Sequence, residues 1–390
     1  MTTRNEKIRI LGKGITALAL KDKFPNATLY DDSDFYEYDS NLNEYTVVSP
    51  GIPPYNNMVL NSKNLVSDYD LFGSIMPFSI WISGTNGKTT TTQMCQHLLK
   101  EYGSIYGGNI GVPLSHLDEK APIWILETSS FTLHYTNNTK PNIYILLPIS
   151  EDHITWHGSF QEYKNAKLKP LSLMNENDIA IIPNEFNNIK TNAHVVSYSN
   201  SDQLCNHFGI EKSKIKFKEP FLLDAILAMA TRKIIFDEIN YDLINEFVID
   251  KHKVEEFKDS KNRLWIDDSK ATNVDATINA IVPYKEKEIH IILGGDDKGA
   301  NLTPLFENIK ELNITVYAIG TNSDKIANFC NQYKIKVENC LYLNIAVSKI
   351  DSNLDENSVA MLSPAAASLD QFKSYAHRGD EFKKFVSSLS

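Results

Sequence analysis

Short apolar runs recur along the chain, and each ends in a turn that contains glycine or polar residues. The runs lie at residues 8–11, 27–30, 79–82, 123–126, 143–147, 264–266, 289–293 and 359–362. Runs of this length and composition are typical of buried strands, and longer stretches between them, such as residues 91–102, predict helices. Alternating strands and helices predict an α/β protein with parallel sheets, in which ligands bind at the carboxyl ends of the strands.

The size and composition are those of ordinary globular domains. A chain of 390 residues predicts two or three domains, each with its own core. The hydrophobic content of 42% and the charged content of 23% are typical of soluble proteins. A formal net charge of -10 argues against a surface that wraps nucleic acid, although a local phosphate site can still be basic.

Features that report on the compartment predict a cytoplasmic protein without membrane contact. Residues 1–7 are polar and lack the apolar core of a signal peptide. No apolar run approaches the length needed to cross a bilayer. Cys95, Cys205, Cys330 and Cys340 form no CxxC pair and have no zinc spacing. They predict free thiols in a reducing compartment, with a disulfide as the alternative.

The first glycine turn, residues 12–17, has the form G-x-G-x-x-A and follows the first apolar run. The second run ends at Asp31 and Asp32. A dinucleotide-binding site has this pattern, with the acid on a ribose. Three interpretations are open at this point: a nicotinamide cofactor, another phosphate-bearing ligand, or packing alone.

The second glycine turn carries the most specific motif of the chain. It reads Gly84, Thr85, Asn86, Gly87, Lys88, Thr89 and Thr90, between a predicted strand and a predicted helix. In such a loop, backbone N–H groups surround phosphate oxygens, the lysine reaches the β- and γ-phosphates, and the hydroxyl ligates Mg²⁺. Only Thr85 and Asn86 separate the two glycines, fewer than in the general P-loop, so a chance match is the alternative.

Two further predicted strands end in candidate metal ligands. Glu127 follows the run at 123–126, and His153 follows the run at 143–147 within a Glu-Asp-His sequence. Taken singly, Glu127 would cap a helix and His153 would be a hydrogen-bonded surface histidine. A P-loop upstream favours metal ligands, because the Mg²⁺ of a nucleotide lies at the carboxyl ends of neighbouring strands.

A third group of polar turns follows the C-terminal strands, at residues 267–273, 294–299 and 363–370. Each turn taken singly is a solvated loop or a helix cap. Three of them at the ends of strands in one α/β unit favour a substrate-binding face.

Together these motifs resemble the Mur ligase family over nearly the whole chain. The stretches that carry the resemblance are residues 84–90, 108–111, 127–131, 151–153, 268–273, 293–296 and 363–372. The stretches 268–273 and 363–372 are similar to the D-glutamate-adding branch in particular. The resemblance implies a cytoplasmic, monomeric ligase that joins an amino group to a carboxylate through an acyl phosphate. Its substrates would be ATP, UDP-N-acetylmuramoyl-L-alanine and D-glutamate.

The resemblance also implies three domains. Residues 1–72 would form a Rossmann-like domain that binds the UDP end of the substrate. Residues 73–250 would form a central P-loop ATPase-type domain with a parallel sheet, and residues 251–390 a Rossmann-like domain that binds the amino acid. The turn at residues 12–17 is thereby assigned to a uridine diphosphate.

The resemblance implies a role for individual residues, carried over position by position. ATP would contact residues 84–90, Asp224, Lys253 and Asp268. Two Mg²⁺ ions would be held by Thr89, Glu127, His153 and Lys167, the lysine as a CO₂-derived N-carbamate. The UDP substrate would contact Gly14, Ile15, Thr16, Asp31, Ser49, Pro50, Gly51, Asn109 and Ser129. D-glutamate would contact Lys270, Thr272, Lys298, Ser368, Leu369 and Tyr375. The catalytic residues would be Lys88, His153 and Lys167.

Lys167 has a simpler interpretation from the residues alone, as a solvated lysine on a helix. A free ammonium beside two Mg²⁺ ions and Lys88 would be repelled, and its pKa would fall. A neutral amine can take up CO₂, which turns a misplaced cation into an anionic ligand for a hard metal ion.

Five positions depart from the family pattern. Lys253 replaces an arginine, and an ammonium cannot reproduce a bidentate guanidinium. Asp224 replaces an asparagine and can accept but not donate as an amide does. Tyr375 replaces a phenylalanine, and Asp32-Ser33 replaces a threonine–arginine pair.

Three rival functions are compatible with parts of the sequence. A related ligase would add a different amino acid or use a folate. A P-loop ATPase or nucleotide-gated regulator would hydrolyse ATP without ligation. An oxidoreductase would bind a nicotinamide at residues 12–17.

Overall fold

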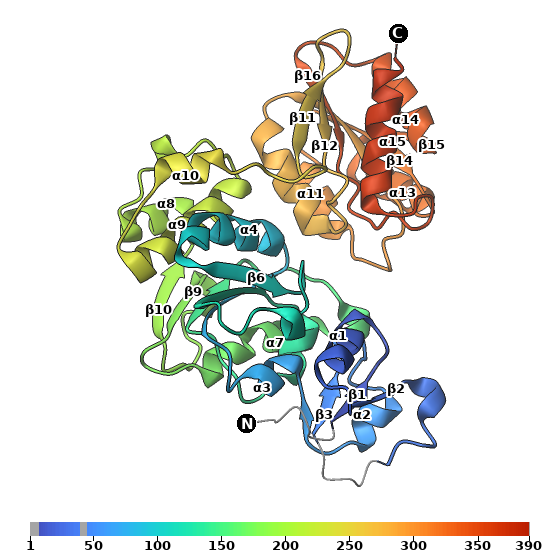
Figure 1. The fold of residues 1–390 in the computed structure, drawn as a ribbon. Helices are drawn as coiled ribbons and strands as arrows, with labels where there is room; N and C mark the ends of the chain where they lie inside the picture. Colours follow the sequence, from blue (N-terminus) through green and yellow to red (C-terminus); the bar gives the residue numbers. More distant parts are fainter. Residues whose placement is uncertain (1–7, 40–44, 390) are drawn as a thin grey trace. The chain divides into compact units, whose positions relative to one another are not determined.

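The computed structural model describes residues 8–39 and 45–389. The polar segment 1–7, on which the prediction of a missing signal peptide depends, lies outside these residues. The chain divides into two compact units, and the second begins at Val248 and also includes Lys218–Pro220. The first unit contains two sheets and the second unit one (Figure 1).

The N-terminal sheet is small and parallel, with strand order β2-β1-β3-β4. Its strands are β1 (Arg9–Leu11), β2 (Thr28–Tyr30), β3 (Thr46–Val48) and β4 (Leu65–Val66). The helices of this region are α1 (Ile15–Lys23), α2 (Asn57–Asn61) and α3 (Asp68–Phe72), drawn in blue in Figure 1. Because β1 and β3 are adjacent, the turns after them meet at one edge of the sheet.

The central sheet is entirely parallel, with strand order β10-β9-β8-β5-β7-β6. Its strands are β5 (Phe78–Ser83), β6 (Ser104–Gly108), β7 (Ile123–Glu127), β8 (Ile143–Leu146), β9 (Ile179–Pro183) and β10 (His194–Tyr198). The helices are α4 (Lys88–Leu99), α5 (Ser130–Tyr135), α6 (Ile154–His157), α7 (Phe160–Leu173), α8 (Ser201–Phe208), α9 (Phe221–Phe236) and α10 (Tyr241–Glu246). Since β5 lies between β7 and β8, the ends of these strands place the P-loop, Glu127 and the loop before His153 on one edge.

The C-terminal sheet has strand order β11-β12-β16-β13-β14-β15 and is parallel except for β11. Its strands are β11 (Glu255–Lys258), β12 (Leu264–Asp267), β13 (Glu288–Gly294), β14 (Ile314–Ile319), β15 (Lys336–Leu341) and β16 (Ser358–Leu362). The helices are α11 (Val274–Ile281), α12 (Thr303–Ile309), α13 (Ser323–Tyr333), α14 (Leu343–Asp351) and α15 (Tyr375–Ser387). The order β12-β16-β13 brings the three polar turns of the C-terminal region to one edge, as the sequence predicts.

The structure confirms the α/β fold and the strands predicted from the apolar runs. The predicted helix 91–102 is displaced: α4 begins at Lys88, because Gly87 with φ 82° caps it, and a 3-10 turn follows Leu99. All four cysteines are buried and free, as predicted. Among the helices of the described residues, none is long and apolar enough to cross a membrane.

Candidate active site

The P-loop joins the end of β5 to α4 through two glycines that no other residue could replace without strain. Gly84 has φ 139°, and a Cβ there would lie 2.5 Å from Cβ of Leu147. Gly87 has φ 82°, and a Cβ there would lie 2.6 Å from Oδ1 of Asp224. The loop is therefore packed tightly between the end of β8 and α9. Its backbone leads into the N-terminus of a 12-residue helix, which favours an anionic ligand.

Lys88 and Thr89, the first residues of α4, point toward different parts of the site. Nζ of Lys88 donates to the carbonyl oxygens of Gly84, at 3.0 Å, and Thr85, at 2.8 Å. The Thr89 hydroxyl donates to Oε2 of Glu127 at 2.8 Å. The ammonium thus lies over the loop, while the hydroxyl faces the end of β7.

Glu127 is a buried carboxylate at the end of β7, the strand next to β5. Its second oxygen, Oε1, accepts a hydrogen bond from Nδ2 of Asn109 at 2.6 Å. It does not cap α5, because Ser129 accepts the capping bond from Thr132 N–H at 3.0 Å. The carboxylate and the Thr89 hydroxyl are adjacent hard oxygen donors, and this donor set fits Mg²⁺.

Lys167 is buried, which rejects its interpretation as a solvated lysine. Nζ of Lys167 donates to the Gly84 carbonyl at 2.6 Å, the same oxygen that accepts from Lys88. Burial and then the Lys88 ammonium lower the pKa of Lys167 well below its usual value, although Asp152 and Glu127 oppose this shift. A buried amine held beside a second cation is suited to carbamate formation.

The loop that carries His153 is attached to the P-loop through Thr85. The Thr85 hydroxyl donates to the Ser150 carbonyl at 3.0 Å and accepts from Ser150 N–H at 2.9 Å. His153 has φ 54°, and its ring packs on Phe131 with 4.7 Å between ring centroids. Nε2 of His153 lies 3.6 Å from Oδ2 of Asp152, and the side chain is half-exposed.

Tyr163 is a further candidate residue of this region, which the sequence analysis did not single out. Its hydroxyl lies 3.0 Å from the Thr85 hydroxyl, and Nζ of Lys167 lies 4.8 Å from its ring centroid. The sequence contained an indication of this contact, because Tyr163 and Lys167 are four positions apart and therefore share one face of a helix. Asp224 joins the same region, since its Oδ1 accepts from the Thr91 hydroxyl at 2.8 Å.

The candidate UDP residues of the N-terminal region lie in the turns after β1, β2 and β3 and in the first turn of α1. These are Gly14, Ile15 and Thr16, then Asp31, then Ser49, Pro50 and Gly51. A Cβ on Gly12 would lie 2.7 Å from Cβ of Ser49, so the first and third turns are in close contact. Ile15 is 80% exposed. The other two candidates, Asn109 and Ser129, belong to the central sheet region.

Asp31 is paired with a lysine that the sequence analysis did not single out. Nζ of Lys13 lies 2.9 Å from a carboxylate oxygen of Asp31 and 2.8 Å from one of Asp34. Hydrogen bonds from Ser33 and Lys13 lower the pKa of Asp31 to about 2. The acid expected on a ribose is therefore already bonded to Ser33 of its own turn and to Lys13 of the turn after β1.

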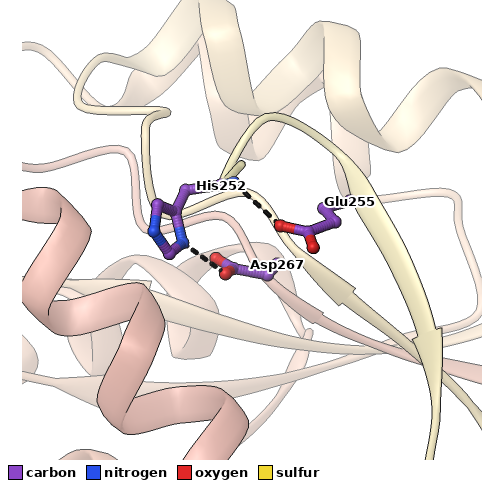
Figure 2. Close-up of side chains that lie close together, drawn as sticks. All are labelled: His252, Glu255 and Asp267. Atoms are coloured by element: carbon purple, nitrogen blue, oxygen red, sulfur yellow. Dashed lines mark hydrogen bonds and ion pairs between the residues drawn. The ribbon is translucent and has the colours of Figure 1, made fainter. Parts of the chain in front are cut away.

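His252, Glu255 and Asp267 form a charged cluster at the start of the second unit (Figure 2). Nδ1 of His252 lies 2.6 Å from Oδ2 of Asp267, and His252 N–H donates to Glu255 at 3.0 Å. In the described part of the chain this is the only set of three with metal-ligand spacing. The Lys383 ammonium lies against both carboxylates, 3.5 Å from Oδ2 of Asp267. The cluster thus already contains a cation, the Lys383 ammonium. The bonds of His252 within the cluster hold the segment that carries Lys253.

Asp268, beside this cluster, is buried rather than solvent-facing. It accepts hydrogen bonds from the Ser363 hydroxyl at 2.6 Å and from Val254 N–H at 3.2 Å. Burial raises the pKa of Asp268 to about 7. Lys253 pairs with Asp250 at 3.0 Å.

The candidate amino-acid residues lie in the three turns of the second unit, except Tyr375, which is the first residue of α15. Nζ of Lys270 lies 4.1 Å from the ring centroid of Tyr375, a cation–π contact. Lys298 has φ 48° and is exposed, and across residues 8–39 and 45–389 its ammonium has no bonding partner. Ser368 is buried, whereas Thr272 and Leu369 are exposed.

Comparisons with known proteins show which family and which solved structures this chain is similar to. The family described as Mur ligase middle domain matches residues 82–219. The chain is 50% identical to a UDP-N-acetylmuramoylalanine--D-glutamate ligase of Campylobacter jejuni, over 98% of this chain and 100% of that protein. It is 43% identical to the ligase of the same name from Helicobacter pylori, over 97% and 99%. Among solved structures, MurF ligase from Thermotoga maritima in complex with ADP aligns with TM-score 0.61 and 13% identity, over 98% and 96%. MurC from the same organism aligns with TM-score 0.56 and 16% identity, over 97% and 98%.

Proposed function

The chain belongs to the UDP-N-acetylmuramoylalanine--D-glutamate ligases of the Mur ligase family, and on that premise we propose how its residues perform the reaction. The enzyme adds D-glutamate to UDP-N-acetylmuramoyl-L-alanine at the expense of ATP, a step of peptidoglycan precursor synthesis. The observation that carries the mechanism is the contact of the P-loop with Glu127 and Lys167 at one edge of the central sheet.

The first step activates a carboxylate that is a poor electrophile. The γ-phosphoryl group of ATP passes to the carboxylate of UDP-N-acetylmuramoyl-L-alanine, giving an acyl phosphate and ADP. Phosphoryl transfer depends mainly on positioning and charge neutralisation. The P-loop backbone N–H groups would hold the phosphates, and Lys88 would move from the Gly84 and Thr85 carbonyls to the transferring group.

Thr89, Glu127, His153 and a carbamylated Lys167 would hold two Mg²⁺ ions. Bound there, the ions supply positive charge that neutralises the phosphate oxygens. The support is the adjacent Thr89 and Glu127 oxygens and the burial of Lys167 beside Lys88. Asp224, Lys253 and Asp268 would complete the ATP contacts, and the turns after β1, β2 and β3 would bind the UDP end.

In the second step the amine of D-glutamate attacks the acyl carbon and loses a proton, and phosphate leaves. Lys298 and Lys270 would bind the carboxylates of D-glutamate, with Ser368 and Tyr375 beside them. Fixing the amine near the acyl carbon can contribute roughly 7–11 kcal/mol to lowering the barrier.

Phosphate release by the purified chain should require both UDP-N-acetylmuramoyl-L-alanine and D-glutamate, and L-glutamate should give little. The reason is that Lys298, Lys270 and Ser368 would fix both carboxylates, so that only one stereoisomer presents its amine. A coupled phosphate assay over a panel of amino acids and UDP-sugars measures this.

Equal rates with L-glutamate would assign the chain to a different amino acid. Release without any amino acid would indicate an ATPase. Binding of a nicotinamide nucleotide would restore the oxidoreductase interpretation of residues 12–17.

Lys298→Ala should raise the KM for D-glutamate by about 10–100-fold and leave the KM for ATP nearly unchanged. A charge-assisted hydrogen bond to a carboxylate is worth about 1.5–3 kcal/mol, which corresponds to that range. Steady-state kinetics with each substrate varied in turn provide the comparison. Lys285→Ala, at an exposed lysine of the same unit, is the matched control. A rise confined to the KM for ATP would remove Lys298 from the amino-acid site.

We place the enzyme in the cytoplasm as a monomer. The four free cysteines support a reducing compartment. Light scattering should give the mass of one chain, 44.1 kDa.

A further inference from the structure

The turn after β14, formed by Gly320, Thr321 and Asn322, contacts both stretches that would bind D-glutamate. Gly295 N–H donates to Oδ1 of Asn322 at 3.0 Å, and the Thr321 hydroxyl donates to the Gly295 carbonyl at 3.0 Å. On the other side, Thr321 N–H donates to Oδ2 of Asp370 at 3.0 Å. One short turn thus connects the loop of Lys298 with the stretch of Ser368 and Leu369.

Asn322 also holds the residue that immediately precedes Lys298. Its Nδ2 donates to Oδ2 of Asp297 at 3.1 Å. Nζ of Lys325, one turn into α13, donates to the same oxygen at 2.8 Å and to the Ala300 carbonyl at 2.9 Å. Partial burial opposes ionisation of Asp297, but Lys325 and Asn322 outweigh it and lower its pKa. The loop around Lys298 is therefore held from both ends by α13 and the turn before it.

The turn after β14 packs tightly against both the Gly294–Gly295 loop and Asp370. Gly320 has φ 73°, and a Cβ there would lie 2.6 Å from both Oδ2 of Asp370 and Cα of Gly295. A Cβ on Gly294 would lie 2.0 Å from the Ile319 carbonyl oxygen. Asp296 and Ala367 exchange two backbone hydrogen bonds of 2.9 Å, which fix the loop against the Ser368 stretch. Lys298 lies two residues after Asp296, in a left-handed conformation that is uncommon for a residue other than glycine.

We propose that Asn322, assisted by Lys325, is a positioning residue for the amino-acid substrate. It does not touch D-glutamate but sets the place of Lys298 relative to Ser368, and so presents a preformed site to the two carboxylates. Preorganisation of this kind determines affinity, because an unrestrained loop must be ordered when the ligand binds. The proposal rests on the proposed function, since it presumes that Lys298 and Ser368 bind the amino acid.

The test uses the full-length chain and the phosphate-release assay. Asn322→Ala and Lys325→Met should each raise the KM for D-glutamate about tenfold, the size expected when a held hydrogen bond is lost. The KM values for ATP and the UDP substrate should stay within about twofold, a selectivity that general destabilisation would not produce. Asn331→Ala, at an exposed asparagine of the same helix, is the matched control and should behave as wild type.

Two results would overturn the positioning role. One is an unchanged KM for D-glutamate in both variants, and the other is an equal rise in the KM for all three substrates. Both results overturn the positioning role when the wild-type enzyme requires D-glutamate for phosphate release. A wild type that releases phosphate without D-glutamate would contradict the proposed function itself, so the two failures are distinguishable.

Discussion

Lys88→Ala and Glu127→Ala should each lower the rate of ATP-dependent phosphate release by about 10³-fold without unfolding the chain. Both remove groups whose interactions strengthen as charge shifts during phosphoryl transfer, and single groups of this kind are worth about 10²–10³ in turnover. Lys88 donates to the Gly84 and Thr85 carbonyls of the loop, and Glu127 accepts hydrogen bonds from Thr89 and Asn109. The measurement is turnover at saturating substrates, with thermal unfolding recorded in parallel.

Lys100→Ala is the control for these variants, because Lys100 is an exposed lysine directly after α4. It should retain wild-type turnover. If Lys88→Ala or Glu127→Ala kept a tenth of the activity, the role assigned to that residue would be wrong. A loss of turnover together with a large fall in melting temperature would instead indicate that the site is held together by the Glu127 hydrogen bonds.

Lys167→Ala should be nearly inactive, and formate or acetate should restore part of its activity. The side chain is buried and shares the Gly84 carbonyl with Lys88, so its removal leaves a space beside the P-loop. A small carboxylate can fill that space and supply the negative charge that the carbamate would have supplied. Turnover measured against carboxylate concentration gives the rescue, and isotope-labelled bicarbonate with NMR detects the carbamate on the wild type directly.

The rescue experiment has two control variants. Lys88→Ala should show no response to formate, because it lacks a cation rather than an anion. Lys164→Ala, on the same helix α7, should retain most of its activity. If Lys167→Ala kept most of its activity, or if labelled bicarbonate gave no carbamate signal on the wild type, we would abandon the carbamate and the two-metal arrangement around it.

Sheet order explains why the local sequence around Lys167 favours a solvated lysine, although the residue is buried. In residues 162–168 it looks like a lysine on an exposed helix face. The helix α7 follows β8, and β8 is the neighbour of β5, so α7 reaches the turn after β5. Its ammonium then meets a carbonyl 83 positions earlier in the chain. No local pattern encodes such a meeting, because it depends on which strands pair.

The same reason applies to the contacts around Asp31 and Asn322. The sequence pattern places Asp31 after a strand, where an acid can bind a ribose, but only the folded turn shows that Lys13 is its partner. Asn322 lies in none of the motifs that the sequence analysis identified. Its two bonds to the loop of Gly295 and Asp297 exist because β14 pairs with β13.

The features that could be predicted from the sequence alone are those that depend mainly on neighbouring residues. Strand–turn–helix alternation predicts the α/β class, and the spacing of Gly84, Gly87 and Lys88 predicts a phosphate loop, because glycine conformations and helix N-termini are local properties. Only the folded chain shows the order of the strands and which side chains are buried, and therefore which ionisable groups perturb one another. Burial and electrostatic coupling depend on distance in space, and the order of strands in a sheet sets that distance.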